Sequence, residues 1–107
     1  MEEFVKRTLL YDFYGELLTP RQREMYESVV LEDYSISEIA AELKISRQGV
    51  HDMIRRCDAA LEDYEARLHL VDRFLEIRRQ VRRIEELAAA HRVPEITDIC
   101  RTIVGEL

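Results

Sequence analysis

The sequence has few of the residues that break helices. Its 107 residues include only 3 glycines, 2 prolines and no tryptophan. A sandwich or barrel of many short strands needs frequent turns, which glycine and proline usually supply, so these counts favour long helices instead. Hydrophobic residues make up 47% of the chain and charged residues 36%, a composition that is typical of a folded protein and not of a disordered one. The sequence therefore predicts one helical domain over residues 1–107 with a single core.

Long apolar runs and cysteine motifs are also absent from the sequence. No apolar run approaches the roughly 18 residues that a membrane span requires, and residues 1–4, MEEF, lack the basic and then apolar pattern of a signal peptide. Cys57 and Cys100 form no CxxC pair and no other metal-ligand spacing. We interpret them as two reduced thiols that pack as small apolar side chains. These absences predict a cytoplasmic protein without membrane insertion.

Motifs for catalysis and for cofactors are likewise absent. His51, His69 and His91 are scattered and form neither an HExxH motif nor a Cys/His cluster. The chain has no GxxxxGKS or GxxxxGKT loop for a nucleotide. No serine or cysteine has a histidine and a carboxylate at a recognisable catalytic spacing. We expect a binding module and not an enzyme, with no cofactor and no metal.

Positive charge is in short supply as well. The 22 acidic and 16 basic side chains give a net charge of −6, which disfavours strong unspecific binding to nucleic acid, because neutralisation of phosphates dominates that affinity. The deficit is uneven along the chain. Residues 1–34, 57–92 and 93–107 carry net charges of −4, −1 and −2, whereas residues 35–56 carry +1. The only net-positive segment is also the segment with the clearest motif.

Apolar residues that recur every three or four positions predict a series of amphipathic helices. The first three span about residues 3–17, 20–31 and 36–43. Thr19 and Gln22 have the spacing of a capping box at the start of the second helix. Ser35 and Glu38 have the spacing of another capping box, and Ser46 is the N-cap of a fourth helix that begins at the next residue.

The C-terminal half of the sequence predicts a helical extension over residues 57–107, because no glycine or proline interrupts residues 50–93. The apolar register slips near residues 68–75, which indicates either one long helix with a bend or two helices. Before the slip, apolar residues have the spacing of coiled-coil a and d positions: Leu61, Tyr64, Leu68, Val71 and Leu75. This stripe predicts either a homodimer through residues 61–75 or a seam that the first and last helices cover within one chain. An amphipathic helix follows Pro94.

Residues 37–56 fit a helix-turn-helix. The apolar side chains fall at the positions where two crossing helices meet: Ile39, Leu43, Ile45, Val50 and Met53. Ala40 is small enough for a close approach of the two helices. Lys44 occupies the turn position that usually holds glycine. It therefore either adopts a left-handed conformation at some cost or changes the turn.

The second helix of this motif presents an outward face with candidate nucleic-acid-binding residues: Ser46, Arg47, Gln48, His51 and Arg55. In a helix-turn-helix this face enters the major groove, where arginine and glutamine contact the edges of guanine and adenine, and arginine also holds phosphate. The alternative is a plain solvated face. Asp52 favours that alternative because phosphate repels a carboxylate, although Asp52 can also accept a hydrogen bond from cytosine.

A second basic feature lies in the extension. Two i, i+4 pairs place four guanidinium groups along one side of a helix: Arg78, Arg79, Arg82 and Arg83. This Arg ridge is suited to RNA phosphates or to an acidic partner. The alternative is a solvated ridge that pairs with Glu76, Glu85 and Glu86 at little gain in stability.

Three segments resemble region 4 of bacterial sigma factors, which binds promoter DNA: LTPRQRE at residues 18–24, SEIA at 37–40 and ISRQGV at 45–50. A longer match adds residues 10–15, 54–56 and 61–65. It is to the YlxM family of small bacterial proteins, and it covers about the first three-quarters of the chain.

The resemblance to YlxM proteins implies an all-α, sigma-region-4-like helix-turn-helix bundle with a long C-terminal helical extension. Members of that family are encoded beside components of the signal recognition particle, which implies a regulatory role in that protein-targeting pathway. The implied partners are DNA or the signal recognition particle RNA, together with the protein subunit of the particle. The alternative is a module that binds proteins or ribonucleoproteins and keeps the helix-turn-helix as a scaffold.

Overall fold

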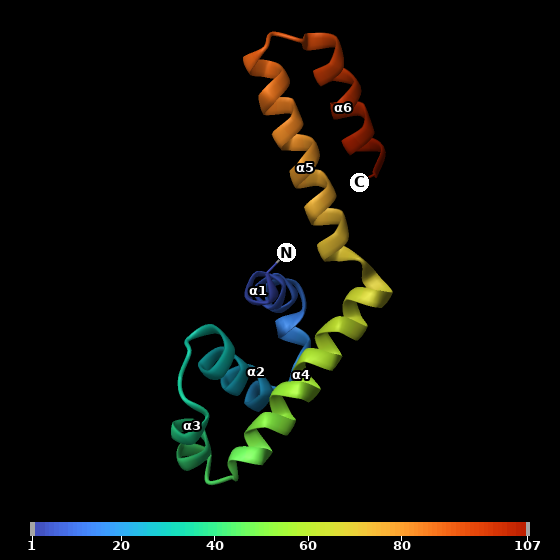
Figure 1. Cartoon of the computed structure of the whole chain (residues 1–107). Helices are drawn as coiled ribbons and strands as arrows, with labels where there is room; N and C mark the ends of the chain where they lie inside the picture. The colour runs from blue at the N-terminus through green and yellow to red at the C-terminus, as the bar shows by residue number, and fades with distance from the viewer. Residues whose placement is uncertain (1, 107) are drawn as a thin grey trace. The chain divides into compact units, whose positions relative to one another are not determined.

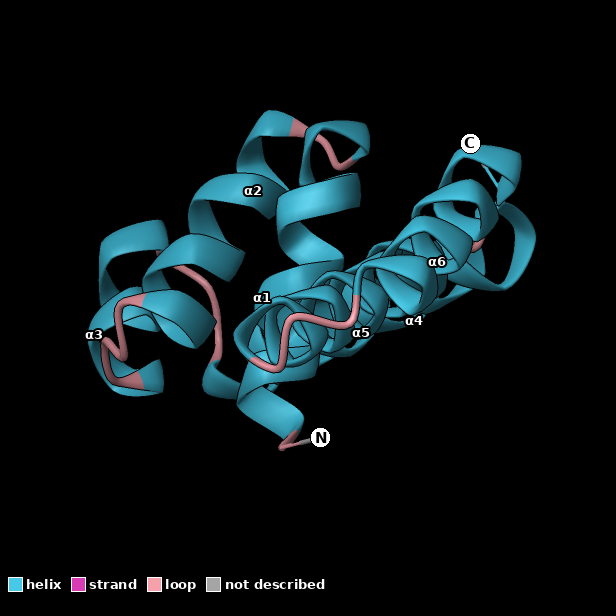
Figure 2. Ribbon diagram, turned by 90° about the horizontal axis from the view of Figure 1, so that it is seen from above, coloured by secondary structure: helices cyan, strands magenta, loops and turns pink. Residues whose placement is uncertain are grey.

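The computed structural model describes residues 2–106, and this part of the chain is helical with no strand (Figure 2). The α-helices are α1 (Glu3–Tyr14), α2 (Pro20–Tyr26), α3 (Ile36–Leu43), α4 (Arg47–Leu68), α5 (Leu70–Ala89) and α6 (Val93–Glu106). A 3₁₀ turn, η1 (Gly15–Leu17), follows α1, and a π-helix, η2 (Glu27–Leu31), continues α2. The predicted all-α class is confirmed.

The chain divides into two compact units, Met1–His69 and Leu70–Leu107. The first unit holds α1 to α4, and the second holds α5 and α6 (Figure 1). Within the described range, no helix is both long enough and apolar enough to cross a membrane.

The helix starts lie where the capping residues predict them. The Thr19 Oγ1 atom accepts a hydrogen bond from the backbone N–H of Gln22 at 3.2 Å, and the Gln22 side chain accepts from the Thr19 N–H at 2.9 Å. This first capping box is confirmed in full. Of the second capping box, the structure of the described residues shows one of the two hydrogen bonds: Ser35 Oγ accepts from the Glu38 N–H at 3.0 Å. The expected return bond from the Glu38 side chain, which is exposed, is not among the bonds of this cap.

The first helix was predicted to continue to residue 17, but the α-helix ends at Tyr14 and tightens into η1. Gly15 lies at this change because the ring of Tyr11 packs against it. A Cβ atom at position 15 would lie 2.8 Å from a carbon of that ring, a distance that real Cβ contacts do not reach. Glycine therefore allows the aromatic side chain to cross the end of α1.

The core of the first unit forms around α4, which α1, α2 and α3 all contact. Among the described residues, the largest fully buried side chains are Tyr14, Met25, Tyr26, Val50, Cys57 and Leu61. Burial of a large apolar side chain contributes roughly 1.5–3 kcal/mol, so this cluster is the main source of stability of the unit. It also leaves the opposite side of the first turns of α4 exposed.

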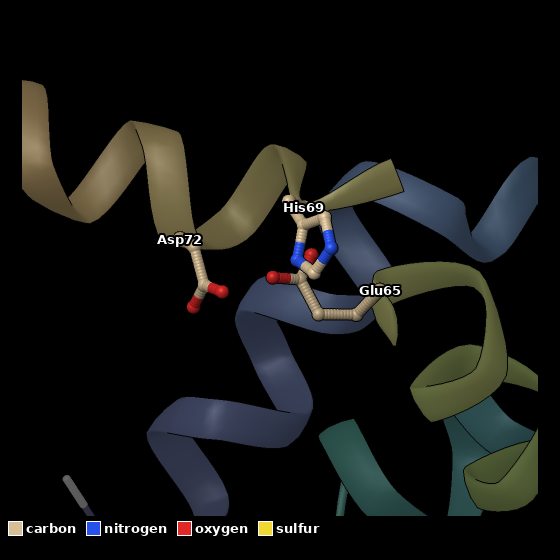
Figure 3. Close-up of side chains that lie close together, drawn as sticks. All are labelled: Glu65, His69 and Asp72. Atoms are coloured by element: carbon tan, nitrogen blue, oxygen red, sulfur yellow. The ribbon is translucent and has the colours of Figure 1, made fainter. Parts of the chain in front are cut away.

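The long stretch after the helix-turn-helix forms two helices and not one. His69 ends α4 in the left-handed conformation, at φ 56° and ψ 28°, and its N–H donates to the carbonyl of Glu65 at 2.9 Å. Figure 3 shows the Glu65 carboxylate beside the His69 ring at this end of α4. The predicted stripe over residues 61–75 is therefore not one continuous helical seam.

The first part of that stripe is covered within the chain. Leu61 is fully buried in the core of the first unit. The ring of Tyr64 lies 6.0 Å from the ring of Tyr14, centroid to centroid. Leu61 is thus unavailable to a homodimer through residues 61–75. The alternative was that the first and last helices cover the seam, and the contact between Tyr64 and Tyr14 agrees with its first half at that position.

The second unit is an antiparallel hairpin of α5 and α6 (Figure 1). A short connection joins the helices, with His91 left-handed at φ 57°. The N–H of Arg92 closes it by donating to the carbonyl of Leu87 at 2.9 Å. Leu87 is 3% exposed and lies in the core of the hairpin.

The two cysteines differ in their surroundings. Both are free thiols, and Cys57 is buried as predicted. Cys100 is exposed, so its predicted packing is wrong. The reason is its position on α6: it lies about 100° around the helix from Ile99, which is partly buried.

Candidate nucleic-acid interface

The helix-turn-helix consists of α3, a short turn and the first half of α4. Lys44 ends α3 in the left-handed conformation, at φ 58° and ψ 42°. Its N–H donates to the carbonyl of Ala41 at 3.3 Å, and the N–H of Ile45 donates to that of Ala40 at 3.0 Å. This pair of bonds is a Schellman motif, which usually takes glycine at the left-handed position. Of the two alternatives for the turn, the left-handed lysine is the one that the structure has.

Apolar packing fixes the angle at which α4 leaves this turn. Ile39 and Ala40 are the buried residues of α3, and Val50 and Ile54 are buried on the facing half of α4. Ser46 caps α4, with its Oγ atom accepting from the N–H of Gly49 at 2.9 Å. The start of α4 is therefore held both by its cap and by its buried side.

The opposite side of α4 carries four of the five predicted nucleic-acid-binding residues, and we name it the α4 face: Arg47, Gln48, His51 and Arg55. All four side chains are exposed. Their i, i+1, i+4 and i+8 spacing places them on one side of the first turns, away from Val50. Ser46 lies at the start of the face, where its oxygen is already used as the helix cap.

Asp52 binds two residues of the α4 face. It accepts a hydrogen bond from the Gln48 side chain at 3.0 Å, and the same oxygen accepts from Arg55 in an ion pair. The bonds from Gln48 and Arg55 lower the pKa of the Asp52 carboxyl, which therefore stays ionised. From the sequence, Asp52 was expected to be repelled by phosphate or to accept a hydrogen bond from cytosine, but not to pair with Gln48 and Arg55. The i, i+3 and i, i+4 spacings to Arg55 and Gln48 could have revealed the pairing.

Two further basic residues near the α4 face did not enter the sequence prediction. Lys44 in the turn and Arg56 beside Arg55 are both exposed. Either side chain can supply a phosphate contact, because long basic side chains reach the DNA backbone from the edge of a groove. The ends of the face are thus more basic than its centre, where Asp52 lies.

A small hollow lies beside α3, and Arg21, Ser28 and Glu42 form part of its lining. Its volume is about 20 Å³, which is enough for roughly one water molecule. This hollow is therefore too small to hold a larger ligand, and the candidate site remains the exposed α4 face.

The Arg ridge lies apart from the α4 face in the sequence and belongs to the second unit. Arg79 pairs with Glu76, and this pairing lowers the pKa of Glu76. Arg83 pairs with Glu86 at 3.2 Å. Two of the three predicted acidic partners are thus found. Among the described residues, Arg78 and Arg82 are exposed and form no ion pair, and neither does Glu85.

Residues 1–99 match the UPF0122 family, whose description reads "Putative helix-turn-helix protein, YlxM / p13 like". A UPF0122 protein of Thermoanaerobacter sp. (strain X514) is 44% identical over 110 residues, which cover 99% of this chain and 94% of that protein. A UPF0122 protein of Caldanaerobacter subterraneus subsp. tengcongensis is 48% identical over 85 residues, covering 79% and 73%. One from Symbiobacterium thermophilum is 47% identical over 90 residues, covering 84% and 81%. The expected resemblance is confirmed and extends further along the chain than the sequence motifs indicate.

Proposed function

Since this chain belongs to the UPF0122 family of YlxM/p13-like helix-turn-helix proteins, we propose that it binds duplex DNA through the α4 face. The observation that carries this proposal is the exposure of Arg47, Gln48, His51 and Arg55 on one side of a capped, rigidly packed helix. It acts as a binding module and catalyses no reaction.

The geometry favours the major groove of B-form DNA. That groove is about 12 Å wide and accepts an α-helix, which lets arginine contact guanine and glutamine contact adenine. The major groove of A-form RNA is too deep and narrow for the same approach. Duplex DNA is therefore the nucleic acid that suits this face best.

Asp52 lowers the affinity that we expect for DNA. Its carboxylate neutralises Arg55 and holds Gln48 in the free protein, so the face has fewer free positive charges than its arginines suggest. Binding that depends on phosphate neutralisation alone should therefore be weak. Contacts to base edges, including a bond from cytosine to Asp52, would provide the selectivity.

The proposed role is regulatory. YlxM proteins are encoded beside components of the signal recognition particle, and on that family context we assign the chain to the same protein-targeting pathway. The assignment rests on gene neighbourhood and not on a residue of this chain.

A second candidate function is a scaffold that binds the signal recognition particle through its RNA or its protein subunit. Charge favours it. The first unit carries 15 acidic and 9 basic side chains, which suits a basic protein partner better than a polyphosphate backbone. The Arg ridge, with Arg78 and Arg82 exposed, would then meet RNA phosphates.

Fluorescence anisotropy distinguishes the two functions. The full chain is titrated at low salt against a labelled random DNA duplex and against labelled signal recognition particle RNA. The same titrations are run with Arg47→Ala plus Arg55→Ala and with Arg78→Ala plus Arg82→Ala. Each double variant removes two exposed arginines, so each is the charge-matched control of the other.

We expect DNA binding that the first double variant loses and the second retains. RNA binding that only the second double variant loses would overturn the proposal in favour of the scaffold. Absence of binding to both nucleic acids would also overturn it, and a titration with the particle's protein subunit would then test the remaining candidate.

A further inference from the structure

Three polar side chains form a connected cluster at the centre of the α4 face. Gln48, Asp52 and Arg55 follow an i, i+4, i+7 spacing, so they form one row along α4. Each of them lies two positions before a buried residue of the same helix: Val50, Ile54 and Cys57. Two positions along an α-helix correspond to a rotation of about 200°. The cluster therefore lies almost opposite the buried side of α4, where an approaching duplex meets it first.

The hydrogen bonds of this cluster leave one oxygen of Asp52 uncommitted. Its Oδ1 atom accepts from the Gln48 side chain at 3.0 Å and also from a terminal nitrogen of Arg55. Within residues 2–106, no hydrogen bond reaches the Oδ2 atom. The Asp52 side chain is 42% exposed, so this carboxylate can accept a further hydrogen bond from a ligand.

Arg55 also keeps most of its donors. A guanidinium group carries several N–H donors in a planar fork, and one nitrogen of Arg55 donates to Asp52. The Arg55 side chain is 69% exposed. Its ion pair restricts where this long side chain points. The cluster therefore presents the donors of an arginine fork directly beside a carboxylate acceptor.

This order of donors and acceptors is complementary to one base pair. In the major groove, guanine presents two acceptors, N7 and O6, and the paired cytosine presents a donor, its N4 amino group. An arginine fork with a carboxylate oxygen beside it supplies two donors and then an acceptor. The A·T pair presents an acceptor, a donor and an acceptor. Its amino group would therefore face an N–H of Arg55, and its thymine O4 would face Asp52.

We propose that Asp52 and Arg55 together select a G·C base pair in the major groove, with Arg55 donating to guanine and Asp52 accepting from cytosine. Gln48 is a positioning residue, because it shares Oδ1 with Arg55 and so holds the carboxylate beside the guanidinium. This inference rests on the proposed binding of duplex DNA and names the base pair that the α4 face selects. Other base pairs are disfavoured because they leave the carboxylate desolvated without a donor.

Selection from a library of duplexes with a randomised segment identifies the preferred sequence. The full chain is incubated with the library, and the bound duplexes are recovered and sequenced. The same selection with Asp52→Asn should lose a G·C preference at one position. Fluorescence anisotropy then compares the selected duplex with one in which A·T replaces only that pair. We expect the original chain to bind the G·C duplex about tenfold more tightly.

Substitutions test the two proposed contacts separately from the overall charge. Asp52→Asn should reduce the preference to about threefold or less. Its affinity should rise on the A·T duplex, because a negative charge is removed, and rise less on the G·C duplex, because the contact with cytosine is weakened. Asp63→Asn is the matched control, since Asp63 pairs with Arg67 further along α4, and it should keep the original preference. Arg55→Lys keeps the charge and loses the fork, so it should also reduce the preference.

Inosine tests which groove carries the preference. An inosine·cytosine pair keeps the N7, O6 and N4 groups of the major groove and lacks only the amino group that guanine presents in the minor groove. We expect it to bind as tightly as the G·C pair. Binding as weak as that of the A·T duplex would overturn the inference, because the minor groove would then carry the preference.

Failure of this inference and failure of the proposed function give different results. Absence of binding to every duplex would overturn both. Binding without a selected G·C pair would overturn the inference alone and leave DNA binding by the α4 face in place. The same holds for a G·C preference that is equal in the original chain and in Asp52→Asn.

Discussion

Arg7 of α1 and Asp58 of α4 form a two-point ion pair, with nitrogen–oxygen distances of 2.5 and 3.2 Å. Tyr26 of α2 donates its hydroxyl hydrogen to the same carboxylate at 2.6 Å. One side chain of α4 therefore joins three helices of the first unit. Both partners of the ion pair are less than one-third exposed, so water screens them less than it screens a surface pair.

Removal of the Asp58 carboxylate should destabilise the protein. Asp58→Ala leaves the Arg7 guanidinium and the Tyr26 hydroxyl without their partner, and we expect a loss of about 2–3 kcal/mol in the free energy of unfolding. Urea denaturation followed by circular dichroism measures it. Glu62→Ala is the control, because Glu62 pairs with Lys6 between the same two helices at 3.0 Å but in the open. Glu62→Ala should lower the free energy of unfolding by only about 0–1 kcal/mol. Equal losses for Asp58→Ala and Glu62→Ala would contradict the proposed role of Asp58.

Stability should fall at alkaline pH because of Cys57. Burial raises the pKa of its thiol from the ordinary value of 9.0 to about 11. The unfolded chain therefore loses this proton at lower pH than the folded chain does. The stability that the protonated Cys57 thiol contributes to the folded chain is fully present below pH 9. The free energy of unfolding then falls by about 1–2 kcal/mol as the pH rises towards 11. Denaturation of the original chain and of Cys57→Ala across this range isolates the thiol, and parallel pH profiles would contradict the prediction.

The left-handed backbone at Lys44 should respond to glycine. Lys44→Gly removes a Cβ that is strained at φ 58°, and we expect a gain of about 0.5 kcal/mol after the added flexibility of the unfolded chain is subtracted. Lys44→Ala is the control, since it keeps the strain and removes the same charge. A glycine variant less stable than the alanine variant in thermal unfolding would show that the turn is not strained.

Asp52 should limit DNA binding. Asp52→Asn removes the negative charge from the centre of the α4 face and releases Arg55 from its ion pair. We expect about threefold to tenfold tighter binding to duplex DNA at low salt, with the gain shrinking as salt increases. Asp63→Asn is matched to it, because Asp63 pairs with Arg67 further along the same helix. Weaker binding by Asp52→Asn than by Asp63→Asn would contradict the prediction.

The helix-turn-helix could be predicted from the sequence because its determinants are local. Ser46 caps α4 three residues before its partner N–H, and the apolar spacing places Val50 inward. Such features depend on neighbours within one or two turns. The spacing also identifies Lys44 as the turn residue, but it leaves open whether this lysine is left-handed or the turn differs.

Other features depend on parts of the chain that are distant in sequence or lack a sequence signal. Arg7 and Asp58 are 51 positions apart, and no periodicity relates them. His69 ends α4 without the glycine that usually marks a helix end. The exposure of Cys100 depends on which side of α6 packs on α5. Because apolar residues lie on two sides of α6, the sequence alone does not show which of these sides is buried.

Amide chemical shifts of the full chain during a titration with duplex DNA test the central claim most directly. They locate the binding surface without any substitution. The account predicts shift changes concentrated between Ser46 and Arg56, with weaker changes at Lys44 and little change in α5 and α6. Changes confined to residues 70–106, or none in the presence of excess duplex, would contradict the claim that the α4 face binds DNA.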